Sequence, residues 1–369
     1  MIRVVHVLTR TNIGGPSVML VDLLDGLDER RFTQTIVRGA AVAEEGDYLA
    51  DRAVRAEVVT IGGLRRAPGF VSELRSLFVM VRTLRRLRPD IVHTHMAKAG
   101  VIGRIAGVLA GVPVRIHTFH GHLLRGYFPP LVTRVVVLVE RILRRITSHA
   151  LVVGEATRRD LVRARIVIES RSSTIMPAAR PIVARERSAA RTALGLPLDA
   201  VIVGFVGRLT GIKRPDRFLR IATAVPEATF VMFGNGPLHA EVRRAAADLG
   251  NVRLLDWNDD IGLVFGALDL VVLTSDNEGV PVSLIEAASM AVPVVATDVG
   301  GVREIVDDAV SGFVAADDAG LALAVRRLVD DPELRRSMGD RGAAMITRRC
   351  AMADYLSAHA ALYERLAGS

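Results

Sequence analysis

The sequence has little of several features that define common protein classes. Its 369 residues include one cysteine, Cys350, which excludes an internal disulfide framework and a thiolate metal cluster. Aromatic residues make up only 4% of the chain, and we find no base-stacking platform or nucleic-acid reading motif among them. No stretch reaches about 18 apolar residues without a charge, so we expect no membrane-spanning helix. The opening MIRVVHVLTRTNIGG resembles a strand and a glycine turn rather than a signal peptide. With a single cysteine, a reducing, cytoplasmic setting is the default expectation.

Apolar residues and arginines are abundant instead. Hydrophobic residues account for 50% of the chain, enough for a large core, and the length fits two domains of about 100–200 residues each. Residues 1–180 hold 28 Lys and Arg against 15 Asp and Glu, whereas the remainder holds 20 against 25. A basic first half and an acidic second half indicate two units with different partners.

Short β-branched runs alternate with longer amphipathic ones in both halves. In the first half, strands are predicted at 2–8, 33–38, 90–93, 114–118, 149–153 and 173–176, and helices at 16–27, 70–87, 97–110, 131–146 and 155–166. In the second half, strands are predicted at 201–207, 228–234, 268–274 and 292–298, and helices at 213–224, 237–248, 281–290 and 318–346. This alternation predicts an α/β fold with two doubly wound parallel sheets and a ligand cleft at the carboxyl ends of their strands.

The domain boundary is expected near residue 178. Residues 176–197 contain three prolines, many charges and no strand period, so we interpret them as the linker. The predicted domains are therefore 1–178 and 179–350. The amphipathic tail, 351–369, is expected to form a helix that packs back on the first domain.

A glycine pair follows the first predicted strand. Gly14 and Gly15 let the backbone approach a ligand, and Pro16 suits the first turn of a helix whose free amides would face an anion. The segment is not a GxGxxG dinucleotide motif, and a tight strand–helix turn is the alternative interpretation.

Five of the nine histidines fall within residues 93–122: His93, His95, His117, His120 and His122. An HxH pair on one strand face can ligate a metal, but the remaining ligands of such sites are lacking, so no metal is expected. His120 precedes Gly121 where a strand gives way to a loop, and we expect it to face the cleft. The other four are expected to be core histidines satisfied by the backbone.

Two cations surround a glycine-rich loop in GFVGRLTGIKRPD. Arg208 follows the predicted strand 201–207, and Lys213 stands in the first helical turn. Lysines are rare in this chain, and this arrangement suits a phosphate. Ordinary surface salt bridges are the alternative.

The segment NEGVPVSLIEAASMAVPVV places two glutamates, Glu278 and Glu286, eight residues apart. Glu286 lies in an almost uncharged stretch with no cation within four residues, so its carboxylate would need a partner such as the hydroxyl pair of a ligand. Amides following Pro281 would form an anion site at the start of the helix. The alternative is that neither glutamate binds a ligand: Glu278 would be an ordinary charge at the start of a helix, and Glu286 a buried glutamate that the fold tolerates.

These motifs together resemble retaining glycosyltransferase family 4, whose members have two Rossmann-like domains (the GT-B fold). EGVPVSLIE is preceded by GRLTGIKRPD and FGNGP and followed by TDVGGVREIV, so the resemblance runs from Gly14 to about Val306. One departure is Met176-Pro177-Ala178-Ala179, where the family usually has Asn-Gly just before the linker. We expect this to alter hinge or acceptor geometry rather than abolish activity.

The resemblance implies a role for each matched residue. His120, Glu278, Arg208 and Lys213 would be catalytic, with the two cations neutralising the leaving diphosphate in place of a metal cofactor. The donor-binding residues would be Gly14, Gly15, Arg208, Lys213, Gly234, Asn235, Glu278, Gly279, Val280, Val282, Ser283 and Glu286, with Glu286 on the ribose. Asn12, Lys98 and Arg125 lie in N-terminal loops expected to shape the acceptor site.

The expected partners are a nucleotide-sugar donor, with uridine favoured by family frequency, and a hydroxyl acceptor that is a glycan, a lipid-linked sugar or a small molecule. Arginine-rich amphipathic helices at 70–87 and 131–146 can rest on an anionic membrane, at the inner face of the membrane for a cytoplasmic protein. A solvated helix face is the alternative. The rival functions are a nucleotide-sugar epimerase of related architecture and a non-catalytic scaffold that binds membrane or polyanion.

Overall fold

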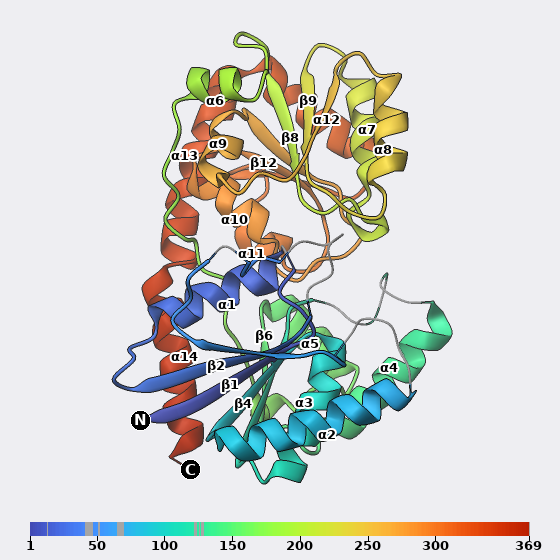
Figure 1. Cartoon of the computed structure of the whole chain (residues 1–369). Helices are drawn as coiled ribbons and strands as arrows, with labels where there is room; N and C mark the ends of the chain where they lie inside the picture. The colour runs from blue at the N-terminus through green and yellow to red at the C-terminus, as the bar shows by residue number, and fades with distance from the viewer. Residues whose placement is uncertain are drawn as a thin grey trace. The chain divides into compact units, whose positions relative to one another are not determined.

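The computed structural model describes residues 1–12, 14–40, 47–50, 52–64, 70–121, 124, 126 and 129–368 (Figure 1). The chain forms two compact units, one of Met1–Pro177 with Ala353–Ser369 and the other of Ala178–Met352. His122 and Arg125, named among the predictions, lie outside the described residues.

Unit 1 is built on a parallel sheet of seven strands within the described residues, in the order β3-β2-β1-β4-β5-β6-β7. The strands are β1 (Ile2–Leu8), β2 (Phe32–Gly39), β3 (Glu57–Ile61), β4 (Ile91–His95), β5 (Val114–Phe119), β6 (His149–Val152) and β7 (Ser172–Thr174). Buried runs such as that of β4 are expected for a sheet covered on both faces. Strand β3 was not predicted, because it is an edge strand whose side chains are mostly exposed.

The helices of unit 1 are α1 (Gly15–Gly26), α2 (Phe70–Leu87), α3 (Ala97–Ala110), α4 (Pro130–Leu143), α5 (Glu155–Arg163), the 3₁₀ turn η2 (Glu169–Arg171) and the C-terminal α14 (Met352–Ala367). One core joins Val5 and Val7 of β1 to apolar residues of α2 and α3, whereas Leu8 packs with α1 in a second core. The hydroxyl of Tyr355 on α14 donates to the carbonyl of Met19 on α1 at 2.9 Å, so the C-terminal helix belongs to this unit.

Unit 2 has a parallel sheet of six strands among the described residues, in the order β10-β9-β8-β11-β12-β13. Its strands are β8 (Ile202–Val206), β9 (Thr229–Phe233), β10 (Val252–Leu255), β11 (Leu270–Leu273), β12 (Val294–Thr297) and β13 (Gly312–Ala315). Its helices are α6 (Arg187–Ala193), η3 (Gly211–Lys213), α7 (Pro215–Ala224), α8 (His239–Ala247), α9 (Ile261–Gly266), α10 (Val282–Ser289), α11 (Val302–Ile305), α12 (Asp318–Asp330) and α13 (Pro332–Arg349). Together the two sheets confirm the predicted α/β, GT-B type of architecture.

Two local predictions in unit 2 were wrong. The segment 318–346 is two helices rather than one, because the Asp331 side chain caps a new helix at the backbone amides of Glu333 and Leu334 and Pro332 cannot continue the previous one. The predicted linker 176–197 contains α6, a short helix capped by Glu186. Within the described residues no helix is both long and apolar enough to cross a membrane.

Candidate active site

Two loops at the carboxyl edge of the unit 2 sheet carry most of the predicted site. Strands β8 and β11 are parallel neighbours, so the loops that follow them meet at the same edge. The Thr274 hydroxyl donates to the carbonyls of Lys213 and Arg214 at 2.8 and 3.0 Å, and the Asp276 amide donates to the carbonyl of Ile212 at 2.9 Å. These bonds hold the two loops as one framework.

Lys213 and Glu278 form an ion pair across this framework. The Lys213 ammonium lies 2.5 Å from Oε1 of Glu278, and the hydroxyl of Ser275 donates to the same oxygen at 2.6 Å. The Glu278 side chain is buried, while that of Lys213 is 22% exposed. Two residues predicted to act together are therefore adjacent, and the partly exposed ammonium can reach an anionic ligand.

Glu286 lies in α10 and is buried, as predicted, but it already has a protein partner. The Arg180 guanidinium, from the segment before α6, lies 2.7 Å from Oε1 of Glu286. The carboxylate therefore has the partner that the sequence said it would need, but this partner is a guanidinium of the same chain rather than the hydroxyl pair of a ligand. The search for a cation within four residues missed Arg180 because the chain brings it from far away in the sequence.

Arg208 extends from the end of β8 and is exposed. In the described part of the chain the Arg208 side chain has no ion-pair partner, so among these residues the salt-bridge alternative does not hold for Arg208, whereas Lys213 does pair with Glu278. Gly234 and Asn235 lie beside the same loop. A Cβ on Gly234 would lie 1.9 Å from the carbonyl oxygen of Gly207, and the Leu209 amide donates to the carbonyl of Asn235 at 2.9 Å. The FGNGP glycine is thus required by close backbone packing against the β8 loop.

The loop from Glu278 to α10 is held by a second glycine pair. The Gly301 amide donates to the carbonyl of Gly279 at 2.6 Å. Gly300 has φ +53°, and a Cβ there would lie 1.9 Å from the Glu278 carbonyl oxygen, so the VGG sequence allows this approach. Val280 is buried, whereas Val282 and Ser283 begin α10 and are partly exposed. Their amides lie in the first turn, where a helix does not use its own N–H groups.

In unit 1 the glycine pair begins α1, with Pro16 in the first turn. Gly14 has φ 159° and ψ 167°, a conformation that is essentially restricted to glycine. Asn12 is buried, and its carbonyl accepts from the Ser17 hydroxyl at 2.7 Å. Lys98, predicted to face the acceptor, pairs with Glu73 at 2.5 Å.

The described histidines of the cluster are satisfied mainly by side chains, so the prediction of backbone partners was wrong. His93 contacts the hydroxyls of Tyr363 and Thr118, and His117 contacts the hydroxyl of Thr94. Nε2 of His120 lies 3.1 Å from Nδ1 of His95. Nδ1 of His120 is buried without a hydrogen-bond partner in the described residues, and burial lowers the pKa of His120 to about 4.

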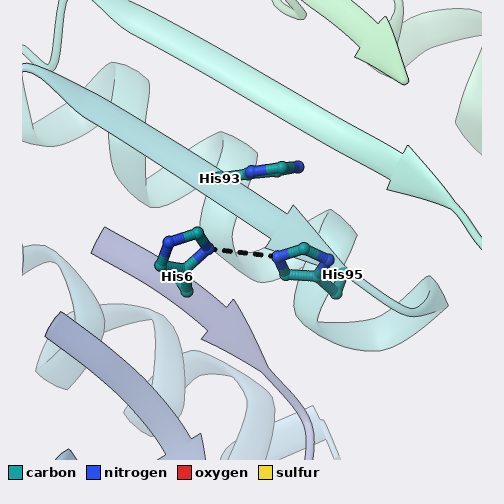
Figure 2. A group of neighbouring side chains, drawn as sticks. All are labelled: His6, His93 and His95. Carbon is teal, nitrogen blue, oxygen red and sulfur yellow. Dashed lines mark hydrogen bonds between the residues drawn. The ribbon is translucent and has the colours of Figure 1, made fainter. Parts of the chain in front are cut away.

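His6 joins this group although no motif singled it out. It lies on β1 in register with His93 on β4, and nitrogens of His6, His93 and His95 lie within 4.8 Å of one another (Figure 2). The sequence could not place His6 beside His93 because the two residues are far apart in the chain, and only the register of β1 with β4 brings them together. Burial lowers the pKa of all three rings, so they are neutral at pH 7.

Comparison of the chain with known proteins identifies the family to which it belongs. The family model for glycosyl transferases group 1 matches residues 186–345, and that for the glycosyl transferase 4-like domain matches residues 14–172. The chain is 29% identical over 309 residues to an Escherichia coli UDP-Gal:alpha-D-GlcNAc-diphosphoundecaprenol alpha-1,3-galactosyltransferase, covering 78% of each protein. It is 32% identical over 287 residues to D-inositol 3-phosphate glycosyltransferase of Saccharomonospora viridis, covering 69% of this chain and 65% of that protein.

Solved structures agree on the fold. HepE of Anabaena, solved with UDP and glucose, superposes with a TM-score of 0.83 at 20% identity, covering 99% of this chain and 100% of HepE. Sucrose-phosphate synthase of Thermosynechococcus elongatus gives a TM-score of 0.87 at 18% identity over the whole of both chains. With the two family models spanning both units, the chain belongs to glycosyltransferase family 4 and is a glycosyltransferase with two Rossmann-like units.

Proposed function

We propose that this glycosyltransferase moves a hexose from a nucleotide-diphosphate sugar to an acceptor hydroxyl, with retention at the anomeric carbon and without a metal. The observation that carries the proposal is the Lys213–Glu278 pair at the carboxyl edge of the unit 2 sheet, with exposed Arg208 on the same loop as Lys213. A diphosphate carries the charge that these two cations would neutralise, and a sugar carries the hydroxyls that a carboxylate accepts.

The role of each group follows from its chemistry. Lys213 and Arg208 would hold the diphosphate, and Glu278 would exchange part of its contact with Lys213 for hydroxyls of the transferred sugar. Amides of Gly279, Val280, Val282 and Ser283 would donate to sugar and phosphate oxygens, while Pro281 has no N–H to offer. Gly234 and Asn235 would line the same donor site.

Glu286 would accept hydrogen bonds from the ribose hydroxyls. Its pair with Arg180 means that the ribose must share this carboxylate with the guanidinium or displace it. From unit 1, Gly14 and Gly15 would approach the diphosphate and His120 the donor sugar. Asn12 and Lys98 remain proposed acceptor residues.

Uridine is the proposed donor base. The E. coli relative is named for UDP-Gal, and HepE was solved with UDP and with UDP-glucose. Those names support a UDP-sugar over other nucleotide sugars, and the lipid-diphosphate sugar in the name of the E. coli relative supports a lipid-linked acceptor.

Retention requires the new bond to form on the face from which the diphosphate leaves. The bond between the anomeric carbon and the diphosphate oxygen breaks, the acceptor oxygen bonds to that carbon, and the acceptor proton passes to the departing phosphate. The enzyme then needs no separate base. Its contribution is to stabilise the charge that grows on the diphosphate, and one such group is worth about 10²–10³-fold in turnover.

Slow donor hydrolysis tests this proposal without the acceptor. The protein is incubated with radiolabelled UDP-, GDP-, TDP- and ADP-hexoses, with and without EDTA, and released nucleotide and sugar are measured. We expect release of UDP that EDTA leaves unchanged and that Lys213→Ala lowers about 10²-fold, with the α-anomer of the sugar formed first from an α-linked donor. Release from GDP-hexose alone would contradict the uridine donor, a 2-epimer product would indicate an epimerase, and no nucleotide binding would indicate a scaffold.

An exposed apolar stripe supports contact with a membrane. On α4, Leu131, Val135, Leu138 and Ile142 follow one another at helical spacing and are 72%, 55%, 59% and 56% exposed. Exposed Arg134, Arg141 and Arg145 flank the stripe, whereas Glu140, the acidic residue of α4, is buried against Arg104. Apolar and cationic groups on one helix face fit the headgroup region of an anionic bilayer, and we propose that this face binds the inner leaflet.

Vesicle sedimentation tests this contact. Leu138→Glu removes apolar area and adds a repelled charge, so we expect binding to phosphatidylglycerol-containing vesicles to fall about tenfold. The control is Leu323→Glu, which changes a 69% exposed leucine on α12 of unit 2 and should leave binding unchanged. Equal loss in both variants, or equal binding to phosphatidylcholine vesicles, would contradict the proposed surface.

A further inference from the structure

A continuous series of polar side chains crosses the sheet of unit 1 and ends at His120. Its members come from adjacent strands or their ends: Gln34 from β2, His6 from β1, His95 from β4 and His120 after β5. All but His120 are buried below one tenth exposure. Nothing in the roles assigned above uses Gln34, His6 or His95, yet a core position in a parallel sheet normally holds an apolar residue.

Gln34 fixes the direction of the first hydrogen bond. Its amide nitrogen donates to the carbonyl of Leu24 at 3.0 Å, so its amide oxygen faces Nε2 of His6 at 3.3 Å. An amide oxygen can only accept a hydrogen bond. The proton of the neutral His6 ring must therefore lie on Nε2, which leaves Nδ1 of His6 as a bare acceptor.

The same argument passes from ring to ring. Nδ1 of His6 lies 3.4 Å from Nε2 of His95, so His95 must donate from Nε2 (Figure 2). That leaves Nδ1 of His95 bare, and it lies 3.1 Å from Nε2 of His120, which must donate in turn. The proton of His120 is thereby assigned to Nε2, and its Nδ1 carries a lone pair.

The tautomers of His6, His95 and His120 can be assigned because each of these imidazole rings is neutral and carries one N–H proton. Burial lowers the pKa of His6 to about 3, that of His120 to about 4, and that of His95 well below its ordinary value. The ionisable groups around the series include His93, His117, His359 and Tyr363. Burial lowers the pKa of the three histidines and raises that of Tyr363, so all four are neutral at pH 7.

We propose that Gln34, His6 and His95 are positioning residues that hold His120 in its Nε2–H tautomer, so that Nδ1 accepts a hydrogen bond from a hydroxyl of the bound sugar. The free end of the series supports this role, because Nδ1 of His120 is buried with no partner in the described residues. Such an atom costs free energy in the unliganded protein and gains a partner when a hydroxyl arrives. The identity of the hydroxyl rests on the proposed function; the tautomer does not.

His93 supplies the matched control. It is buried and packs against His95 with ring centroids 4.3 Å apart and the rings tilted by 32°, but its nitrogens face Tyr363 and Thr118 rather than the series. If the cluster acts only by packing, changes at His93 and His95 should have similar effects. If it sets a tautomer, only His95 should matter to His120.

The test is ¹⁵N NMR of ring-labelled histidine in the whole protein, with His120 assigned by its loss in His120→Gln. We expect wild-type His120 to be protonated at Nε2 and bare at Nδ1. His95→Leu should give a mixture of tautomers and raise the KM for donor or lower kcat/KM about tenfold. His95→Asn, whose side-chain oxygen can accept from Nε2 of His120, should restore the tautomer and most of the activity, and His93→Gln should change neither.

Wild-type His120 protonated at Nδ1 would overturn the proposal whatever the variants do. An unchanged tautomer in His95→Leu, or a change in His93→Gln as large as in His95→Leu, would also overturn it. If His95→Leu does not fold, Gln34→Leu tests the far end of the series and should likewise mix the tautomers. Because the NMR signal needs no donor, an inactive wild type with the expected tautomers would overturn the proposed function and leave the series supported.

Discussion

Lys213 is the residue on which the proposed charge stabilisation depends most. Lys213→Ala should lower turnover of a nucleotide sugar about 10²-fold, because the growing charge of the diphosphate loses its ammonium. Arg220→Ala is the control, since Arg220 is an equally charged residue of unit 2 that pairs with Asp216 and Asp318 at the surface. Steady-state kinetics and a thermal melt of both variants measure the effect. Equal activity of the two variants would remove Lys213 from the mechanism.

For single residues, the sequence predicted which side chains belong to the site better than it predicted which side chains they contact. Lys213 and Glu278 could be assigned to one edge of the sheet because each follows a recognisable strand. Arg180 and His6 could not be found this way. Their partners, Glu286 and His95, lie far away in the chain, and only the strand register and the path of the segment before α6 bring them together.

Helix α6 shows how a segment without an apolar pattern is fixed in the fold. The Arg191 guanidinium on α6 is fully buried and lies 2.6 Å from Oδ2 of Asp269, which also accepts from the Ile202 amide at the start of β8. This buried pair, rather than periodicity, attaches the helix to the sheet. The linker prediction failed here because prolines, charges and the lack of a strand period do not exclude a short helix that a buried ion pair holds in place.

Asp269→Ala should therefore destabilise unit 2 strongly. It leaves the Arg191 charge buried without its carboxylate, at a cost of about 3–5 kcal/mol in the free energy of unfolding. Arg187→Ala is the control, because Arg187 pairs with the same carboxylate but is 52% exposed and should cost less than about 1 kcal/mol. Urea unfolding measures both. A loss below about 1 kcal/mol for Asp269→Ala would contradict the buried-pair account.

Most strands found by pattern are central ones, with edge strand β7 an exception. Strands β1, β4, β5, β8, β11 and β12 are buried on both faces, so their β-branched runs are unmistakable. The missed strands β3, β10 and β13 lie at or beside sheet edges. There the mixed exposure of the side chains weakens the same signal.

Across the whole chain, the histidines divide unequally between the units. His239 is the one histidine in the sequence of unit 2, and the others fall within the residues of unit 1. Burial lowers the pKa of His6 to about 3 and of His120 and His359 to about 4. The unfolded chain binds these protons near pH 6.5 and the folded chain does not, so stability is full above about pH 6.5 and is lost as pH falls toward about 4.

Mild acid should therefore open unit 1 before unit 2. At about pH 5 each of these histidines costs ~2 kcal/mol relative to neutral pH. Hydrogen exchange measured by mass spectrometry at about pH 7 and about pH 5 should show protection lost in peptides of unit 1, after correction for the intrinsic exchange rate. Fluorescence of Trp257, the single tryptophan, reports on unit 2 and should stay native. If peptides of unit 2 lost hydrogen-exchange protection before those of unit 1, the account in which buried, neutral histidines of unit 1 make it acid-sensitive would be contradicted.

The account as a whole depends on a sugar nucleotide replacing protein partners in unit 2, and a crystal structure with bound UDP-hexose tests this most directly. We predict the diphosphate on Lys213 and Arg208, a lengthened Lys213–Glu278 contact, and ribose hydroxyls on Glu286 in place of, or beside, Arg180. A nucleotide bound elsewhere, with the Lys213–Glu278 and Arg180–Glu286 pairs both intact, would contradict it.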